Sequence, residues 1–247
     1  MEKQAPMEIR LQKYFTDCGI MSRRAAEKVI EEGLVKVNGK AAHLGQKIIP
    51  GRDRVEYNGE LIVMQKEAEK LYIMLNKPRG VITSLSDEKG RRCIADLIKD
   101  VPGRVYPVGR LDYNSDGLLL LSNDGEFTNR LTHPRHSIPK IYFVKVSGKV
   151  TSEQMHGLTS AMTIDGYKLE PVQVDIYDIT DTSSILQFTL FEGRNRQIRK
   201  MCEQVGLRVL RLKRIAIGSV QLGDLPAGKW RRLTAKEVKY LMGKNKD

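Results

Sequence analysis

The sequence predicts an α+β fold with a mainly antiparallel β-sheet, preceded by a small α/β unit. The chain has 247 residues, 40% of them hydrophobic, so one large and one small domain with sizeable cores are expected. Many short apolar runs, separated by Gly, Pro and Asn, follow one another through the larger C-terminal part, as strands and turns do. Helical patterns lie between and after these runs, which favours the α+β class.

Two helices and a small sheet are predicted for the first unit, residues 8–60. The apolar face of the first helix is formed by Leu11, Tyr14 and Phe15. Ser22 is a natural N-cap for a second helix over 23–32, and Gly33 fits the C′ position at its end. Alternation over 35–40, with an Asn-Gly pair inside it, then predicts a hairpin.

A polar, charged linker is predicted over residues 61–70, and the second domain over residues 71–243. The apolar runs predicted as its strands are 71–75, 80–83, 118–121, 142–146, 172–176 and 185–190. Its helices are predicted at 125–131, 152–161, 197–205 and 235–242.

The charge of the chain predicts a polyanionic partner. Lys and Arg number 42 against 30 Asp and Glu, a net charge of +12 with a pI near 9.6. Nucleic acid is favoured over an anionic membrane, because no window approaches the roughly 18 apolar residues of a spanning helix. The N-terminus also lacks an apolar signal core, so a cytosolic location is expected.

No metal, cofactor or disulfide framework is expected. Cys18, Cys93 and Cys202 lie far apart without a C-x-x-C spacing, and the four histidines lack an H-E-x-x-H arrangement. A phosphate-binding G-x-x-x-x-G-K-[ST] loop is also missing, which argues against a nucleotide hydrolase.

The loop over 109–117 is the first candidate for chemistry, because it is predicted to be a turn between the run 105–108 and the strand 118–121. Asp112 would lie in this turn, where functional side chains are often found. Two plainer interpretations exist. Asp and Asn are common turn formers. The pattern from Asp112 to Gly117 also resembles a calcium-binding EF-hand, although Asn123 occupies the twelfth position, which requires Glu.

The second candidate is a basic stretch over residues 189–232, which holds eleven Lys and Arg against three Asp and Glu. This balance of +8 exceeds what a solvated helix face needs, and clustered arginines suit bidentate contacts with phosphate. A third feature, Tyr142 at the start of an apolar strand, would by itself be ordinary packing.

Four motifs together resemble the bacterial ribosomal RNA pseudouridine synthases of the RsuA/RluB family. They are Asn76-Lys77-Pro78-Arg79-Gly80, Gly109-Arg110-Leu111-Asp112, Lys140-Ile141-Tyr142, and the segment from Glu192 to Met201. The first unit resembles the S4 RNA-binding domain through Arg10-Leu11-Gln12-Lys13, Ser22-Arg23-Arg24-Ala25-Ala26-Glu27 and Val37-Asn38-Gly39-Lys40. The combined resemblance covers about residues 8–242.

The resemblance implies a catalytic site. Asp112 would be the catalytic aspartate for conversion of uridine to pseudouridine, either trapping the sugar covalently or removing a proton from it. Arg199 would pair with Asp112 and keep it ionised, since an adjacent opposite charge lowers the pKa of an acid. Tyr142 would stack on the target base after the base has left its helix or loop.

The remaining basic residues are predicted to contact RNA. In the second domain they are Arg110, Lys140, Arg194, Arg196, Lys200, Arg211, Lys213 and Arg214. In the S4-like unit they are Arg10, Lys13, Arg23, Arg24 and Lys28. The charge of residues 8–60 is only +2, so a solvated helix face is the alternative there.

The resemblance further implies an rRNA substrate, and 23S rRNA is favoured over 16S rRNA. A ribosome assembly intermediate is a possible form of this substrate. The protein is expected to be a monomer, because the sequence has no obvious apolar repeat. The competing hypothesis is a non-catalytic RNA-binding or ribosome-assembly protein. Asp112 and Tyr142, an acidic and an aromatic residue among the basic ones, favour the hypothesis of an enzyme. A protein that only binds phosphate gains nothing from a carboxylate.

Overall fold

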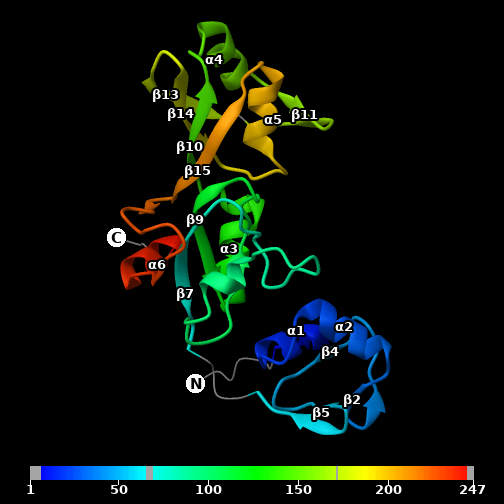
Figure 1. Cartoon of the computed structure of the whole chain (residues 1–247). Helices are drawn as coiled ribbons and strands as arrows, with labels where there is room; N and C mark the ends of the chain where they lie inside the picture. Colours follow the sequence, from blue (N-terminus) through cyan, green and yellow to red (C-terminus); the bar gives the residue numbers. More distant parts are fainter. Residues whose placement is uncertain (1–6, 65–68, 171, 244–247) are drawn as a thin grey trace. The chain divides into compact units, whose positions relative to one another are not determined.

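A computed structural model describes residues 7–64, 69–170 and 172–243. The chain divides into two compact units, Met1–Glu69 and Lys70–Asp247, each of which is described by itself (Figure 1). The second unit is a mixed α/β structure built on a mainly antiparallel sheet, so the predicted α+β class is confirmed. Within the described residues, no helix is long and apolar enough to cross a membrane.

The first unit packs two helices against a small sheet. Its helices are α1 (Leu11–Asp17) and α2 (Arg23–Glu31). Its strands are β1 (Ile9–Arg10), β2 (Val35–Val37), β3 (Lys40–Ala41), β4 (Lys47–Ile48), β5 (Val55–Tyr57) and β6 (Glu60–Ile62). The predicted cap is confirmed, because the Ser22 side chain accepts a hydrogen bond from the backbone N of Ala25 at 3.2 Å. Gly33 follows the helix with a φ of +72°, as expected at C′.

The first unit extends beyond residue 60, the boundary expected from the sequence. Strand β6 pairs with β5 up to Ile62, whose side chain belongs to the core, and the hydroxyl of Tyr14 donates to the Ile62 carbonyl at 3.1 Å. Residues 61 and 62 are therefore part of the sheet and not of the predicted linker. Residues 65–68 of that linker lie outside the described part of the chain.

The second unit contains a nine-stranded sheet whose main path has the strand order β13-β14-β10-β15-β9-β7-β17. These strands are β7 (Tyr72–Lys77), β9 (Asp116–Ser122), β10 (Lys140–Ser147), β13 (Gln173–Ile179), β14 (Ser183–Leu190), β15 (Val209–Ile217) and β17 (Trp230–Arg232). Strand β8 (Tyr106–Val108) pairs with β9, and β16 (Val220–Gln221) pairs with β15. A separate hairpin joins β11 (Thr163–Ile164) to β12 (Tyr167–Lys168).

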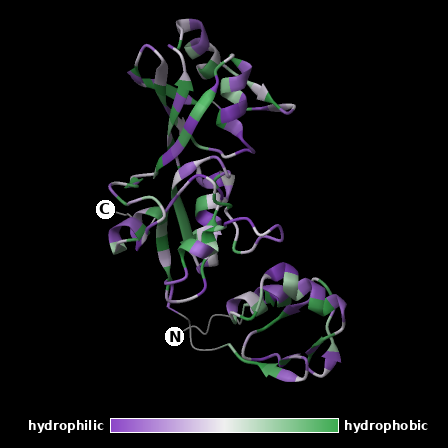
Figure 2. Ribbon diagram, in the orientation of Figure 1, coloured by the Kyte–Doolittle hydropathy of each residue, from purple (hydrophilic) through white to green (hydrophobic). Residues whose placement is uncertain are grey.

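Helices cover this sheet and create three apolar cores. Helices α4 (Ser152–Thr159) and α5 (Gln197–Gln204) contribute Leu158, Ile198 and Met201 to the core formed with β10, β13, β14 and β15. Helices α3 (Gly125–Thr132) and α6 (Ala235–Leu241) pack over one face of β7 and β9. The other face of these strands packs against the 3-10 helix η1 (Ile94–Leu97). Strand β9 is thus buried on both faces, and Figure 2 shows it as mostly hydrophobic.

The two parts of the sheet meet at a short parallel pairing of β9 with β15, which aligns Asp116 with Lys213 and Gly117 with Arg214. Gly117 has a φ of +106°, and a Cβ there would lie 2.2 Å from the backbone O of Arg214, so only glycine fits. Strand β15 was not predicted, because its basic residues were assigned to RNA contacts alone.

Residues 80–83, predicted as a strand, form a loop that makes only an isolated bridge between Ile82 and Cys93.

Candidate active site

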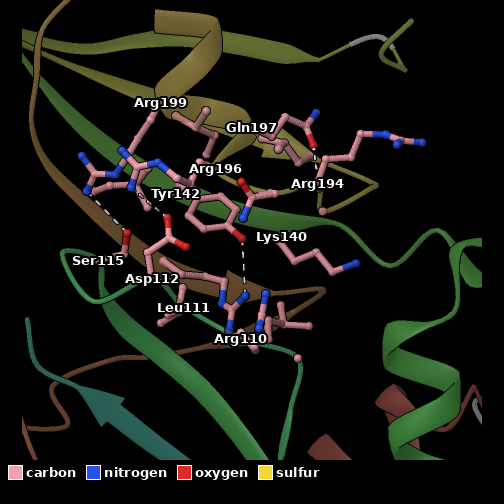
Figure 3. Close-up of a pocket in the computed structure, with 18 of the residues that line it drawn as sticks. Arg110, Leu111, Asp112, Ser115, Lys140, Tyr142, Arg194, Arg196, Gln197 and Arg199 are labelled. Carbon is pink, nitrogen blue, oxygen red and sulfur yellow. Dashed lines mark hydrogen bonds and ion pairs between the residues drawn. The ribbon is translucent and has the colours of Figure 1, made fainter. Parts of the chain in front are cut away.

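A cavity of about 380 Å³ opens where the loop after β8, the first residues of β10, the segment before α5 and strand β15 come together (Figure 3). Of the predicted site residues, it is lined by Arg110, Asp112, Lys140, Tyr142, Arg194, Arg196, Arg199 and Arg214. Lys200, Arg211 and Lys213 are not among its lining residues. A volume of this size suits a small organic group such as a nucleoside.

Asp112 lies in the turn between β8 and β9, as predicted. The turn is closed by a hydrogen bond from the Ser115 backbone N to the Asp112 carbonyl at 3.0 Å. Thr83 anchors it from the side, since its hydroxyl donates to the Leu111 carbonyl at 2.6 Å and lies 3.2 Å from the Leu111 backbone N. The side chain of Asp112 keeps 38% of its surface exposed and points into the cavity (Figure 3).

The arginine nearest to the Asp112 carboxylate differs from the one expected. Nη1 of Arg196 lies 3.8 Å from Oδ2 of Asp112. Arg199 instead donates from Nη2 to the carbonyl of Asn114 at 2.9 Å, and within the described chain it forms no ion pair with Asp112. Arg199 therefore holds the backbone of the Asp112 turn, while Arg196 faces the acid. Burial, together with the charge of Arg196, lowers the pKa of Arg199, and the charge of Asp112 opposes this shift.

The local backbone explains why Arg196 can reach Asp112. Arg196 precedes α5 in the left-handed conformation, with a φ of 52°, which is uncommon for residues with a side chain and often found at functional sites. The turn before it is fixed by hydrogen bonds, because the Gln197 side chain accepts from the Arg194 backbone N at 3.1 Å and donates to Glu192 at 3.1 Å.

Tyr142 contributes the aromatic wall. It begins the run of β10 residues that face the α4–α5 core, and its hydroxyl accepts a hydrogen bond from Nη1 of Arg214 at 3.4 Å. The Arg214 guanidinium also lies 5.9 Å from the centre of the tyrosine ring and donates from Nε to the Leu118 carbonyl at 2.7 Å. Arg214 is only 5% exposed and supports Tyr142 and strand β9, while its predicted contact with the RNA backbone stays a prediction.

Lys77 lies beneath the Asp112 turn, and sequence reasoning did not identify its role, although it belongs to the motif Asn76-Lys77-Pro78-Arg79-Gly80. Its side chain is fully buried, and its ammonium group donates to the carbonyls of Pro78, Val81 and Ser115 at 3.0, 2.7 and 2.9 Å. Burial lowers the pKa of Lys77 to about 8, and the charges of Asp116 and Asp112 oppose this shift. The signal available in the sequence was a lysine at the end of a mainly apolar strand.

Several other basic residues of the 189–232 stretch already have acidic partners. Nε of Arg194 lies 3.2 Å from Glu192, and Arg211 donates to Asp116 at 2.7 Å. Lys200 pairs with Asp165. An RNA phosphate would have to compete with these carboxylates. The predicted contacts of this unit without a carboxylate within 4.0 Å in the described chain are Arg110, Lys140, Lys213 and the buried Arg214.

The predicted RNA-binding side chains of the first unit lie on or beside its two helices. Lys13 pairs with Asp17, and Lys28 lies 3.7 Å from Glu32. Arg10, Arg23 and Arg24 are exposed and have no carboxylate within 4.0 Å in the described part of the unit. These three arginines are therefore the side chains best able to meet phosphate there.

Comparison with known proteins agrees with this architecture. The family model for RNA pseudouridylate synthase matches residues 71–204, and the S4 domain model matches residues 9–53. A solved structure described as a pseudouridylate synthase aligns with a TM-score of 0.68 and 31% identity, covering 94% of this chain and 99% of that one.

Curated relatives give the same result. The chain is 45% identical to ribosomal large subunit pseudouridine synthase B of Bacillus subtilis, over 94% of this chain and 95% of that protein. It is 37% identical to the dual-specificity RNA pseudouridine synthase RluF of Escherichia coli K12, over 93% of this chain and 77% of that protein.

The fold and site define an RNA-modifying isomerase with an N-terminal S4 domain. The chain belongs to the RNA pseudouridine synthase family, within the group of RsuA-type enzymes that includes RluB and RluF. The catalytic interpretation of the sequence is thereby supported over the non-catalytic RNA-binding one.

Proposed function

We propose that the protein converts a specific uridine of ribosomal RNA into pseudouridine, with Asp112 as the catalytic residue. The observation that carries this proposal is the meeting of one carboxylate, two arginines and an aromatic ring in a single cavity (Figure 3). A site built only to hold phosphate has no use for the exposed carboxylate at its centre.

The reaction breaks the bond from N1 of uracil to C1′ of the ribose and joins C1′ to C5 of the same base. The hydrogen on C5 leaves as a proton, and N1 gains one, so no redox change occurs. Asp112 assists the cleavage as a nucleophile at C1′ or as a base toward the sugar, and both routes need an ionised carboxylate.

The surrounding residues orient the acid and the base. Arg196 faces the carboxylate, and Arg199 holds the Asn114 carbonyl beside it, so the turn and the acid have defined positions. Tyr142, fixed by Arg214, offers an aromatic face on which the extruded uracil stacks. Arg110 and Lys140, at the edge of the cavity, are placed to hold phosphates of the flanking strand.

Large-subunit rRNA is the favoured substrate. The Bacillus subtilis relative is described as a large-subunit enzyme, and the similarity covers nearly all of both chains. The proposed target is therefore a uridine of 23S rRNA. The enzyme would act as a monomer in the cytosol, on a ribosome assembly intermediate.

The decisive experiment replaces Asp112 by Asn and measures tritium release from 23S rRNA carrying [5-³H]uridine. Release should fall by more than about 10³-fold, a loss typical of removing an essential catalytic side chain, while RNA affinity stays close to that of the wild type. Asp181→Asn is the matched control, because that side chain is 93% exposed and forms a surface ion pair with Lys149. Turnover retained by Asp112→Asn would overturn the assignment.

A further inference from the structure

A second basic region lies outside the 189–232 stretch. Residues 127–152 contain five Lys and Arg and no Asp or Glu. Part of this segment forms a wall of the active-site cavity, since Leu131, Thr132 and Lys140 line it. Between them, the end of α3 and the short helix η2 (Pro134–His136) carry Arg130, His133, Arg135 and His136, here called the 130–136 cluster.

The cluster is adjacent to the catalytic turn. A Cβ built on Gly109, the first residue of that turn, would lie 4.0 Å from the Thr132 side chain. Thr132 lies within the 130–136 segment, and Lys140, which also lines the cavity, follows His136 by four residues. An RNA strand whose nucleotide enters the cavity therefore has this cluster beside its path.

Within the cluster, two guanidinium groups face one imidazole. Nε of Arg135 donates to Nε2 of His136 at 3.0 Å, and Nη1 of Arg130 lies 3.4 Å from Nδ1 of the same ring. A neutral imidazole offers only one acceptor nitrogen. If Nε2 accepts from Arg135, Nδ1 carries the proton and turns an N–H group toward Arg130. Protonation of the ring would remove the remaining acceptor as well.

The group thus holds more hydrogen-bond donors than acceptors. No carboxylate of the described residues lies within 4.0 Å of Arg130, His133, Arg135 or His136. Burial and the charges of Arg135, Arg130 and His133 lower the pKa of His136, as expected for a ring surrounded by cations without a counter-charge. An anion with several acceptor oxygens would satisfy these donors.

A purely structural role explains two members of the cluster, Arg130 and His133. Nε of Arg130 donates to the Leu241 carbonyl at the end of α6 at 3.2 Å, and cations are favoured at the C-terminus of a helix. His133 accepts from the Arg135 backbone N at 3.3 Å, which orders the loop. Neither contact uses the guanidinium of Arg135, which is exposed.

We propose that the 130–136 cluster binds a phosphate of the RNA strand that carries the target uridine, with Arg135 and His136 as its main contacts. The proposal rests on the proposed function, because it assumes that an RNA strand enters the cavity. Arginine and histidine in this arrangement present donors to two oxygens of one phosphate, and such contacts fix the register of the strand without reading its sequence.

The test measures the affinity of the full-length protein for in vitro transcribed 23S rRNA at a series of salt concentrations. Arg135→Ala should lower the slope of log Kd against log salt by about 0.7 to 0.9, the value for one lost phosphate contact. At low salt, Kd should rise about tenfold, as for the loss of one hydrogen bond to a charged group. Arg135→Glu should raise Kd further.

Lys149→Ala is the matched control. Lys149 follows the far end of β10, roughly 25 Å along the strand from Lys140, and it pairs with Asp181. This variant should keep the wild-type slope. An unchanged slope for both Arg135 variants would overturn the proposal. If instead the slope differed as expected between the wild-type protein and Arg135→Ala, but the wild-type protein formed no pseudouridine, the proposed function would fail while the phosphate site stood.

Discussion

At the scale of single residues, Lys77 couples the catalytic turn to the sheet. Its ammonium group donates to two carbonyls of the loop that follows β7, those of Pro78 and Val81, and to the carbonyl of Ser115 in the Asp112 turn. An ammonium group has three N–H bonds, so the charged form satisfies all three carbonyls. This arrangement offsets the cost of burying the charge.

Replacing Lys77 by Met should therefore lower the free energy of unfolding by about 3 kcal/mol or more, because three buried carbonyls lose their partner. Activity should fall beyond what instability explains, since the Ser115 carbonyl and the Asp112 turn are no longer held. Urea denaturation and tritium release at a temperature where the variant is folded measure the two effects. Lys99→Met, at an exposed position, should change stability by less than about 0.5 kcal/mol.

Some residues of the candidate site could be predicted from the sequence, and others could not. The motif resemblance identified Asp112, Tyr142 and the arginines that meet in the cavity, although their catalytic roles stay predictions. Which arginine faces Asp112 depends on the left-handed backbone of Arg196, and no local pattern indicates it. The burial of Arg214 could not be predicted either, because it follows from the pairing of β15 with β9.

At the scale of elements, the pairing of β9 with β15 controls where the catalytic turn lies. Gly117→Ala would place a Cβ 2.2 Å from the Arg214 backbone O, and both strands would have to separate. The loss of stability should exceed about 2 kcal/mol. Activity should drop as well, because Tyr142 depends on Arg214. Thermal unfolding and single-turnover kinetics check this expectation.

Gly125→Ala is the control for Gly117→Ala. Gly125 begins α3, and an added Cβ would meet no atom within 4 Å, so stability should stay the same or rise slightly. Equal losses in the two variants would show that the close approach of β9 to β15 does not limit stability.

The C-terminal helix α6 is tied to the sheet edge by an acid whose protonation can be followed. Glu237 accepts from Arg231 in β17 at 2.7 and 2.8 Å and from the Thr234 backbone N at 2.7 Å. The hydrogen bond from Arg231 is the largest cause that lowers the pKa of Glu237 below its usual 4.5. Because the folded-state pKa is depressed, the stabilisation is complete above about pH 4.5 and is lost as pH falls through the folded-state value.

Glu237→Gln should thus cost about 1 kcal/mol at pH 7, a value reduced by the partial exposure of Arg231. Below pH 4.5 the difference from the wild type should shrink toward zero, as measured by urea denaturation at several pH values. Glu203→Gln on the exposed side of α5 should show no such dependence. A difference that stayed constant down to the lowest pH would contradict the assignment.

Most elements could be predicted because their signals are local. The capped helix α2, the hairpin after it and the helices α3 to α6 follow from periodicity and turn residues. Strand β15 was missed because its alternation includes Arg211 and Lys213, whose charge was interpreted only as contacts with RNA. Their strand is stabilised by contacts distant in sequence, such as Arg211 with Asp116.

At the scale of the whole molecule, the net charge is divided unequally between the two units. Residues 70–247 hold 30 Lys and Arg against 19 Asp and Glu, so they carry +11 of the net +12. General attraction to RNA therefore resides mainly in the catalytic unit. The first unit, nearly neutral, would add local contacts through Arg10, Arg23 and Arg24.

Deleting residues 1–69 should leave the second unit folded, since each unit has its own apolar core and compact contacts. Affinity for 23S rRNA should fall by about 10- to 100-fold, corresponding to one or two lost charge-assisted contacts. Affinity for an unrelated RNA of equal length should change much less, because the +11 unit remains. The triple variant with Ala at Arg10, Arg23 and Arg24 in the full chain should reproduce the selective loss. If the deletion weakened binding to both RNAs equally, the first unit would contribute general attraction and not recognition of the substrate.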